Sequence, residues 1–174
     1  MTSSSAARPA CRLATWLAIW LTTGLAAAML AGCAANPWQV RVTPGQTEAE
    51  MLAAMGTPTA RYPMASSTQR VEYATGPSGK VTWMIDLDAT GRVKATEQVL
   101  TVQNFARVRN GQTSQDLLLM LGQPAERARE GQNSETWSWR YENNNCLWAR
   151  VTVSGLGHVR GNALIQGDPR CDTP

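Results

Sequence analysis

The hydrophobic and polar positions of the chain form one pattern twice, with a shift of 66 residues between the copies. In the first copy, Thr47 and Glu50 form a capping-box pattern ahead of a short apolar face, which ends at Gly56 and Pro58. These signals predict a helix of about nine residues that starts at the box and stops at the glycine. The second copy repeats them at Thr113, Asp116, Leu117, Leu118, Leu121, Gly122 and Pro124. No gap is needed anywhere in the match, which indicates a tandem duplication.

Period-two alternation of apolar and polar residues follows each helix pattern and predicts strands. The expected strands are residues 69–75, 80–87 and 92–102 in the first copy, and 135–141, 146–153 and 158–166 in the second. Tight turns at 88–91 and 154–157 favour antiparallel pairing. The predicted fold is therefore α+β, with two tandem units that each pack a short helix on a three-stranded antiparallel meander. We expect the residues between the units, 102–108, to add a helical turn.

The pattern leaves one face assignment open. Either Trp137 and Trp139 or Trp148 lie on the sheet face opposite the helices, because a slip of one residue exchanges the two faces.

The chain begins with a segment that differs from the rest. Arg8 and Arg12 precede an uncharged apolar run over residues 13–30, and small residues lead from this run to Cys33. This order predicts a secretory signal peptide. The alternative is a transmembrane anchor, since the run reaches the lower limit for spanning a bilayer.

The residues Leu30, Ala31, Gly32 and Cys33 resemble the bacterial lipobox, which favours the signal peptide. The resemblance implies that Cys33 carries lipid and becomes the first residue of the mature protein. Several acyl chains would hold the protein stably at a bilayer. Ala34 stands where Asp tends to mark inner-membrane retention, which implies the periplasmic face of the outer membrane. The expected organisation is a signal peptide (1–32), a lipidated cysteine and tether (33–43), and two repeats (44–104 and 105–174).

The remaining cysteines predict a crosslink. If Cys11 is discarded and Cys33 lipidated, Cys146 and Cys171 form an even pair in an oxidising compartment, and we expect a disulfide between them. The alternative is a pair of free thiols or half a metal site, for which the other ligands are lacking.

Charge and composition argue against several classes of function. The chain has 16 Lys and Arg against 13 Asp and Glu, and removal of the signal leaves a net charge near +1. This balance does not suit a nucleic-acid-binding protein. Asp86 and Asp88 could form an acid/base pair, but a polar sheet face and a hairpin start explain them better. His158 is expected at an exposed strand start. We predict no catalytic residues, cofactor, metal site or small-molecule substrate, and hence no enzyme.

The repeated motif reads Gly111-Gln112-Thr113, Leu121-Gly122-Gln123-Pro124 and Trp137-Ser138-Trp139-Arg140-Tyr141 in the second copy, and Gly45-Gln46-Thr47, Met55-Gly56-Thr57-Pro58 and Val71-Glu72-Tyr73 in the first. This motif resembles that of the SmpA/OmlA (BamE-like) outer-membrane lipoprotein family. A usual member has one such unit, whereas this chain has two. The resemblance implies an accessory subunit of outer-membrane β-barrel assembly that holds other assembly subunits. Tandem units also resemble the β-lactamase inhibitor protein fold, which implies a periplasmic binding or inhibitor module instead.

The sequence does not identify partner-binding residues. Arg107, Arg109, Arg127 and Arg129 flank the second helix pattern, where they could meet anionic headgroups. Ordinary surface arginines beside Glu126 and Glu130 are the preferred interpretation.

Overall fold

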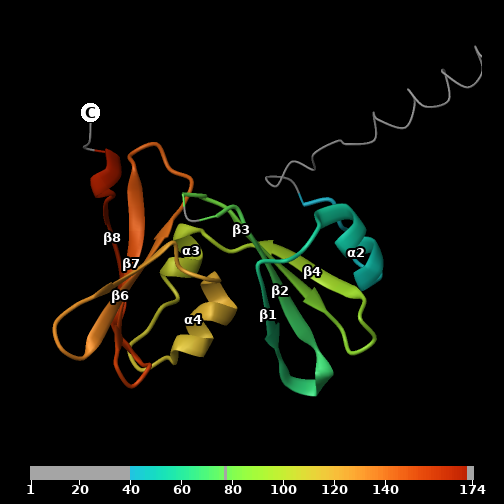
Figure 1. The fold of residues 1–174 in the computed structure, drawn as a ribbon, viewed down its shortest axis with the longest axis horizontal. Helices are drawn as coiled ribbons and strands as arrows, with labels where there is room; N and C mark the ends of the chain where they lie inside the picture. The colour runs from blue at the N-terminus through green and yellow to red at the C-terminus, as the bar shows by residue number, and fades with distance from the viewer. Residues whose placement is uncertain (1–39, 77, 172–174) are drawn as a thin grey trace, which may run out of the picture. The chain divides into compact units, whose positions relative to one another are not determined.

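The computed structural model describes residues 40–76 and 78–171, which form an α+β fold with two antiparallel four-stranded sheets (Figure 1). The helices are α2 (Glu48–Met55), α3 (Val102–Phe105) and α4 (Ser114–Leu121), with 3-10 turns at Ala65–Ser67 and Pro169–Cys171. The first sheet contains β1 (Ala60–Pro63), β2 (Gln69–Ala74), β3 (Thr82–Leu87) and β4 (Val93–Gln98). The second contains β5 (Glu126–Arg129), β6 (Ser134–Arg140), β7 (Leu147–Ser154) and β8 (Val159–Gly167). The predicted signal peptide and Cys33 lie outside the described residues.

Each sheet is an antiparallel meander, as predicted, because its strands are hydrogen-bonded in chain order. The prediction of three strands per sheet is wrong, since β1 and β5 add a fourth at one edge of each. Both strands are only four residues long, and Tyr62 of β1 is their one buried residue. Pro63 ends β1, a position where an edge strand tolerates the missing backbone donor.

Both predicted capping boxes are confirmed. The backbone N of Thr47 donates to Glu50 Oε2 (2.7 Å), and the N of Glu50 donates to Thr47 Oγ1 (3.3 Å). Thr113 and Asp116 form the same pair of bonds at 2.8 and 3.1 Å. Each helix ends at a glycine with positive φ, 79° at Gly56 and 76° at Gly122, a conformation that side chains with a Cβ disfavour.

The first meander ends earlier than predicted. β4 stops at Gln98 rather than at residue 102, because Thr101 already caps α3 by accepting a hydrogen bond from the backbone N of Asn104 (3.2 Å). The helical turn expected over 102–108 is therefore present as α3.

Two clusters of buried side chains form the core. In the first, Met51 of α2 packs with Val71, Ile85 and Leu87 of the first sheet, and Val42 joins them. Residues 33–43 were predicted to be a tether, but Val42, near the end of this segment, packs in the core.

The second cluster is larger and spans both sheets. Leu117 and Leu121 of α4 pack with Trp139 of the second sheet, and with Tyr62 and Met84 of the first. The first sheet therefore contacts α2 on one face and shares a core with α4 on the other.

The alternation of β6 and β7 resolves the tryptophan faces. Trp137 and Trp139 belong to the cluster around α4. Trp148 pairs with Arg140 across the β6–β7 ladder, on the opposite face of the sheet. The face opposite α4 therefore carries Trp148.

Candidate functional site

A buried carboxylate, Glu72, lies where the first sheet meets the end of α4. Glu72 is fully buried in the middle of β2, although charged side chains are rarely buried without partners. Its neighbours Val71 and Tyr73 point into the cluster around α2, so alternation directs Glu72 to the other face of the sheet. The sequence suggests a solvated position here, because Arg70 and Glu72 alternate with apolar residues as on an exposed face.

Three donors from different segments satisfy this carboxylate. The hydroxyl of Tyr62 donates to Oε2 at 2.5 Å, and the backbone N of Gln123 donates to the same oxygen at 3.0 Å. Thr59 Oγ1 donates to Oε1 at 3.2 Å. Burial, reinforced by the hydrogen bond to Glu72, raises the pKa of Tyr62 well above its usual value. The phenol of Tyr62 therefore stays protonated and donates its hydrogen bond. These bonds join β1, β2 and the segment after α4.

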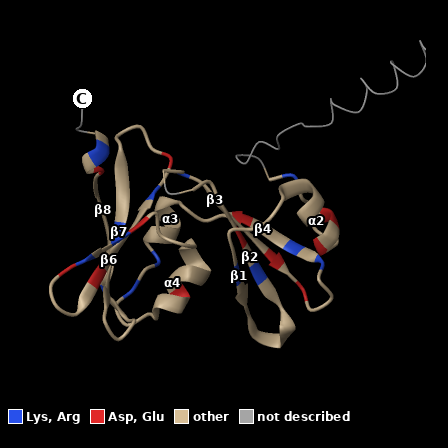
Figure 2. Cartoon of the chain, in the orientation of Figure 1, with Lys and Arg blue, Asp and Glu red and all other residues tan. Residues whose placement is uncertain are grey.

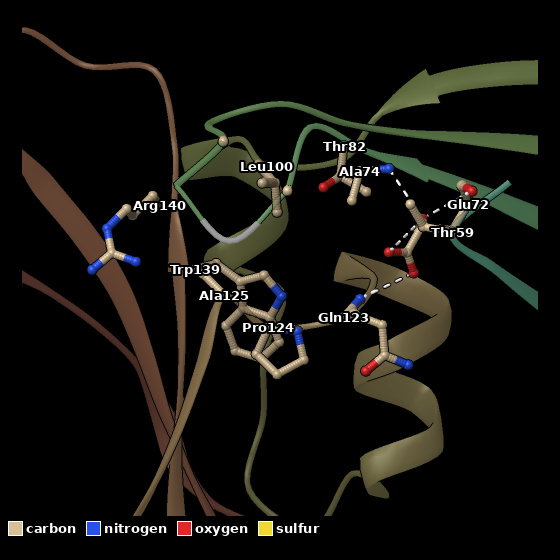
Figure 3. Close-up of a pocket in the computed structure, with 12 residues that line it drawn as sticks. Thr59, Glu72, Ala74, Thr82, Leu100, Gln123, Pro124, Ala125, Trp139 and Arg140 are labelled. Carbon is tan, nitrogen blue, oxygen red and sulfur yellow. Dashed lines mark hydrogen bonds between the residues drawn. The ribbon is translucent and has the colours of Figure 1, made fainter. Parts of the chain in front are cut away.

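A cavity of about 210 Å³ lies beside this cluster (Figure 3). Leu100, Pro124 and Trp139 supply much of its apolar wall, and Glu72 and Thr82 lie on its polar side. The indole N of Trp139 donates to the carbonyl of Gly122 at 3.1 Å, which fixes the ring beside the end of α4. Because the carboxylate oxygens already accept bonds from the protein, the arrangement is suited to holding segments together.

Arg70 makes a second connection between the first sheet and α4. Its Nε and Nη2 donate to the two carboxylate oxygens of Asp86 at 2.6 and 2.8 Å. Its Nη1 donates to the carbonyl oxygen of Leu119, in the last turn of α4, at 2.7 Å. An arginine fork thus binds a carboxylate and a helix end at once.

The two aspartates considered as an acid/base pair have separate structural roles. Asp86 is the partner of Arg70. Asp88 starts the β3–β4 hairpin and accepts bonds from Thr90 Oγ1 (2.7 Å) and from the backbone N of Arg92 (3.0 Å). These bonds, the one from Thr90 first, lower the pKa of Asp88. His158 is exposed and directly precedes β8, as predicted. Its backbone forms an isolated β-bridge with Thr113, as the backbone of Arg92 does with Thr47.

An ion pair and a disulfide bond connect the C-terminal residues after β8 to the second sheet and to the loop before β7. Arg140 Nε donates to Asp168 Oδ2 at 2.5 Å, and both side chains are nearly inaccessible. Burial is the largest single influence on the pKa of Asp168 and raises it, but the hydrogen bonds from Arg140 and from the backbone N of Arg170, together with the charges of both arginines, lower the pKa overall. Cys146 and Cys171 form the expected disulfide, with their Cα atoms 6.4 Å apart.

The arginines that flank α4 bond within the chain. Arg107 Nη1 donates to Asn104 Oδ1 (3.2 Å), and Arg109 Nη1 donates to the carbonyls of Ala106 and Val108. Arg127 lies 4.1 Å from the centre of the Trp137 ring. All four arginines of the prediction, Arg129 included, are exposed, and their contact with anionic headgroups stays a prediction.

Two further searches concern the described residues alone. In residues 40–76 and 78–171, no group of three or more His, Cys, Asp or Glu is arranged to hold a metal ion. None of the helices in this part of the chain is both long and apolar enough to cross a membrane.

Sequence reasoning missed the residues that join the two sheets, namely Tyr62, Arg70, Glu72 and Gln123. No local signal could have found them, because Arg70 and Glu72 alternate with apolar residues as on an exposed face. In comparisons with family models, curated proteins and solved structures, nothing matches this chain.

Proposed function

We propose that this protein is an outer-membrane lipoprotein, anchored through Cys33, that serves as a non-enzymatic accessory subunit of outer-membrane β-barrel assembly. The observation that carries the proposal is the Leu30–Cys33 motif at the end of an uncharged apolar run, followed by a duplicated motif. In this proposal, the chain is a tandem pair of helix-on-sheet units. Its work is to hold neighbouring proteins at the periplasmic face of the membrane.

The anchor gives this role a physical basis. A protein with several acyl chains stays at the bilayer and meets membrane partners at a high effective concentration. Weak protein contacts then suffice for assembly.

The connections between the two sheets support a scaffold role. Glu72 binds the backbone of Gln123, and Arg70 binds the last turn of α4. Such buried hydrogen bonds give a defined arrangement of the surfaces that partners would bind.

Recovery of partners from the envelope tests the proposal. The tagged full-length chain is crosslinked in cells, purified from solubilised outer membrane and compared with its Cys33→Ser variant. We expect β-barrel assembly subunits with the parent chain and far fewer with the variant, because the variant lacks the lipid. Recovery of no assembly subunit with the parent chain would contradict the proposal.

A second candidate is a periplasmic binding or inhibitor module of the β-lactamase-inhibitor-protein type. The tandem motif, which resembles that of the β-lactamase inhibitor protein fold, favours this candidate. Inhibition of a β-lactam-processing enzyme by the purified chain would support this candidate, and absence of inhibition would remove it.

A further inference from the structure

Three of the four edge strands have features that discourage pairing with another chain. The edges of the two sheets are β1 and β4, and β5 and β8. β1 and β5 have only four residues each, and β4 carries the charges of Lys94 and Glu97 (Figure 2). β8 differs, because it has nine residues and Arg160, its second residue, is the only charged one. A long edge strand with few charges is suited to pairing with a further strand.

The chain itself covers the beginning of β8. On the side away from β7, the backbone N of Val159 donates to the carbonyl of Gln112 (2.8 Å), and the N of Gly161 donates to Asn110 Oδ1 (3.1 Å). Beyond these residues, no strand of the described part of the chain pairs with this side of β8. We call residues 162–167 the free edge.

Half of the backbone groups of the free edge point away from β7. The N of Asp168 donates to the carbonyl of Cys146 at 2.9 Å, and the register of β8 against β7 is regular over this part of the strand. The residues of an antiparallel strand bond alternately to its two sides. The even-numbered residues therefore bond to β7, and Ala163, Ile165 and Gly167 direct their N–H and C=O groups outward, where a further strand would bond to them.

The free edge also exposes a large apolar side chain on each face of the sheet. Leu164 pairs with Arg150 on the face opposite α4 and is 62% exposed. Ile165 pairs with Ala149 on the face toward α4 and is 40% exposed, although its counterpart in the first repeat, Val99, is fully buried. A strand added beside β8 would cover both side chains, whereas an element packed on either face would cover only one.

The sequence of β8 identifies the strand that fits. Its chemistry reads almost the same in both directions from Leu164, with an apolar residue, an amide and a glycine on each side. The pairs, from the centre outward, are Ala163 and Ile165, Asn162 and Gln166, and Gly161 and Gly167. When a strand pairs antiparallel with its own copy, residues at equal distances from the centre lie opposite each other. The free edge is therefore complementary to itself.

We propose that β8 pairs with β8 of a second copy of this chain, antiparallel and about a two-fold axis at Leu164. Ala163 of each copy exchanges two backbone hydrogen bonds with Ile165 of the other, and the two Leu164 side chains face each other. The two copies of Arg160 lie at opposite ends of the paired segment, so like charges do not meet. The two second sheets become one continuous sheet, and the two-fold axis closes the assembly at the dimer.

Single-cysteine variants of the purified full-length chain test this register. Leu164→Cys is oxidised with copper phenanthroline, and the products are separated by mass without reductant. We expect several-fold more disulfide-linked dimer than with Ile165→Cys, because residue 164 faces itself in a non-hydrogen-bonded pair, with Cα atoms about 4.5 Å apart, within the range of a disulfide. Ile165 faces Ala163 instead. Both replaced side chains are exposed, so the fold stays intact. The parent chain controls for the native cysteines.

A charge exchange at the axis separates pairing from an effect on the fold. Leu164→Lys and Leu164→Glu are prepared with different tags, alone and mixed. Each variant alone should not associate, since like charges would lie directly opposite each other, whereas the two variants together should co-purify several-fold better than either like pair. Damage to the fold would not be repaired by mixing.

The following results would overturn the proposal: no dimer of Leu164→Cys above that of the parent chain, equal crosslinking of Ile165→Cys, or no gain in co-purification on mixing the charged variants. The proposal does not rest on the proposed function, and each result is independent of whether Cys33 is lipidated.

Discussion

The backbone N of Gln123 donates a 3.0 Å hydrogen bond to the carboxylate of Glu72, which lies 51 residues earlier in the chain and is fully buried. The same oxygen accepts a hydrogen bond from the hydroxyl of Tyr62, and the indole N of Trp139 donates to the carbonyl of Gly122, next to Gln123. The first sheet and the end of α4 are therefore held by polar bonds as well as by their common apolar core.

Replacement of this carboxylate by its amide should destabilise the fold. In Glu72→Gln, the size is unchanged, but an amide N–H₂ replaces one oxygen that accepts from a donor. A buried donor without an acceptor costs about 2 kcal/mol, so we expect a loss of this size in the free energy of unfolding. Urea denaturation at pH 7 measures it. The matched change Glu142→Gln, at an exposed position, should have almost no effect, and equal losses in both variants would contradict the role of Glu72.

The buried pair of Arg140 and Asp168 predicts a pH-dependent loss. Asp168→Asn leaves the guanidinium without its charged partner, and breaking a buried pair costs about 3 kcal/mol. The pKa of Asp168 is lowered in the folded protein, so its stabilisation is complete above the unfolded value and disappears as pH falls through the folded one.

Urea denaturation of the parent chain and Asp168→Asn at two pH values checks this. The difference between them should be full at pH 7 and should shrink below about pH 4, where the unfolded carboxyl binds its proton. If the difference in the free energy of unfolding stayed constant down to about pH 2, the negative charge of Asp168 would not contribute to stability.

The disulfide should contribute stability through the loop that it closes. Cys146 and Cys171 are 25 residues apart, and the chain-entropy model gives about 3 kcal/mol for a loop of this length. The double variant Cys146→Ala, Cys171→Ala should unfold at correspondingly lower urea. Reduction of the parent chain by dithiothreitol should give a similar shift, and dithiothreitol should not affect the double variant. An unchanged midpoint in the double variant would contradict this contribution.

The two capping boxes predict matched effects in the two repeats. Thr47→Ala and Thr113→Ala each remove a side chain that accepts from the backbone N of the residue three positions later. Each should lower the free energy of unfolding by about 1 kcal/mol. Thr57→Ala, at an exposed position after α2, is the control and should have almost no effect. If only one of the two variants lost stability, the helix of the other variant would not depend on its cap.

Local signals were sufficient to predict much of the fold. Both capping boxes, both terminal glycines and six of the eight strands follow from side-chain periodicity and turn chemistry, which depend on neighbours in the chain. β1 and β5 escaped prediction because each has only four residues, with just Ala60 and Tyr62 on the apolar face of β1 and Ala128 alone on that of β5. These edge strands are specified by pairing with β2 and β6, which no local pattern reveals.

The connections between the sheets could not be predicted for the same reason. Arg70 and Glu72 have the sequence pattern of a solvated strand face. Glu72 is buried and Arg70 is half-buried because the end of α4 covers them. The tryptophan faces required the register of β6 against β7. The disulfide was predictable, because Cys146 and Cys171 are the only cysteines left once Cys11 is assigned to the signal peptide and Cys33 to the lipid.

Mass spectrometry of the amino-terminal peptide of the full-length chain, expressed in a Gram-negative bacterium, tests the central claim most directly. The account predicts that the mature chain begins at Cys33 and carries diacylglycerol on its sulfur together with an amide-linked acyl chain. A mature chain that begins at Met1, or one whose Cys33 is unmodified, would contradict the claim that the protein is a lipid-anchored scaffold.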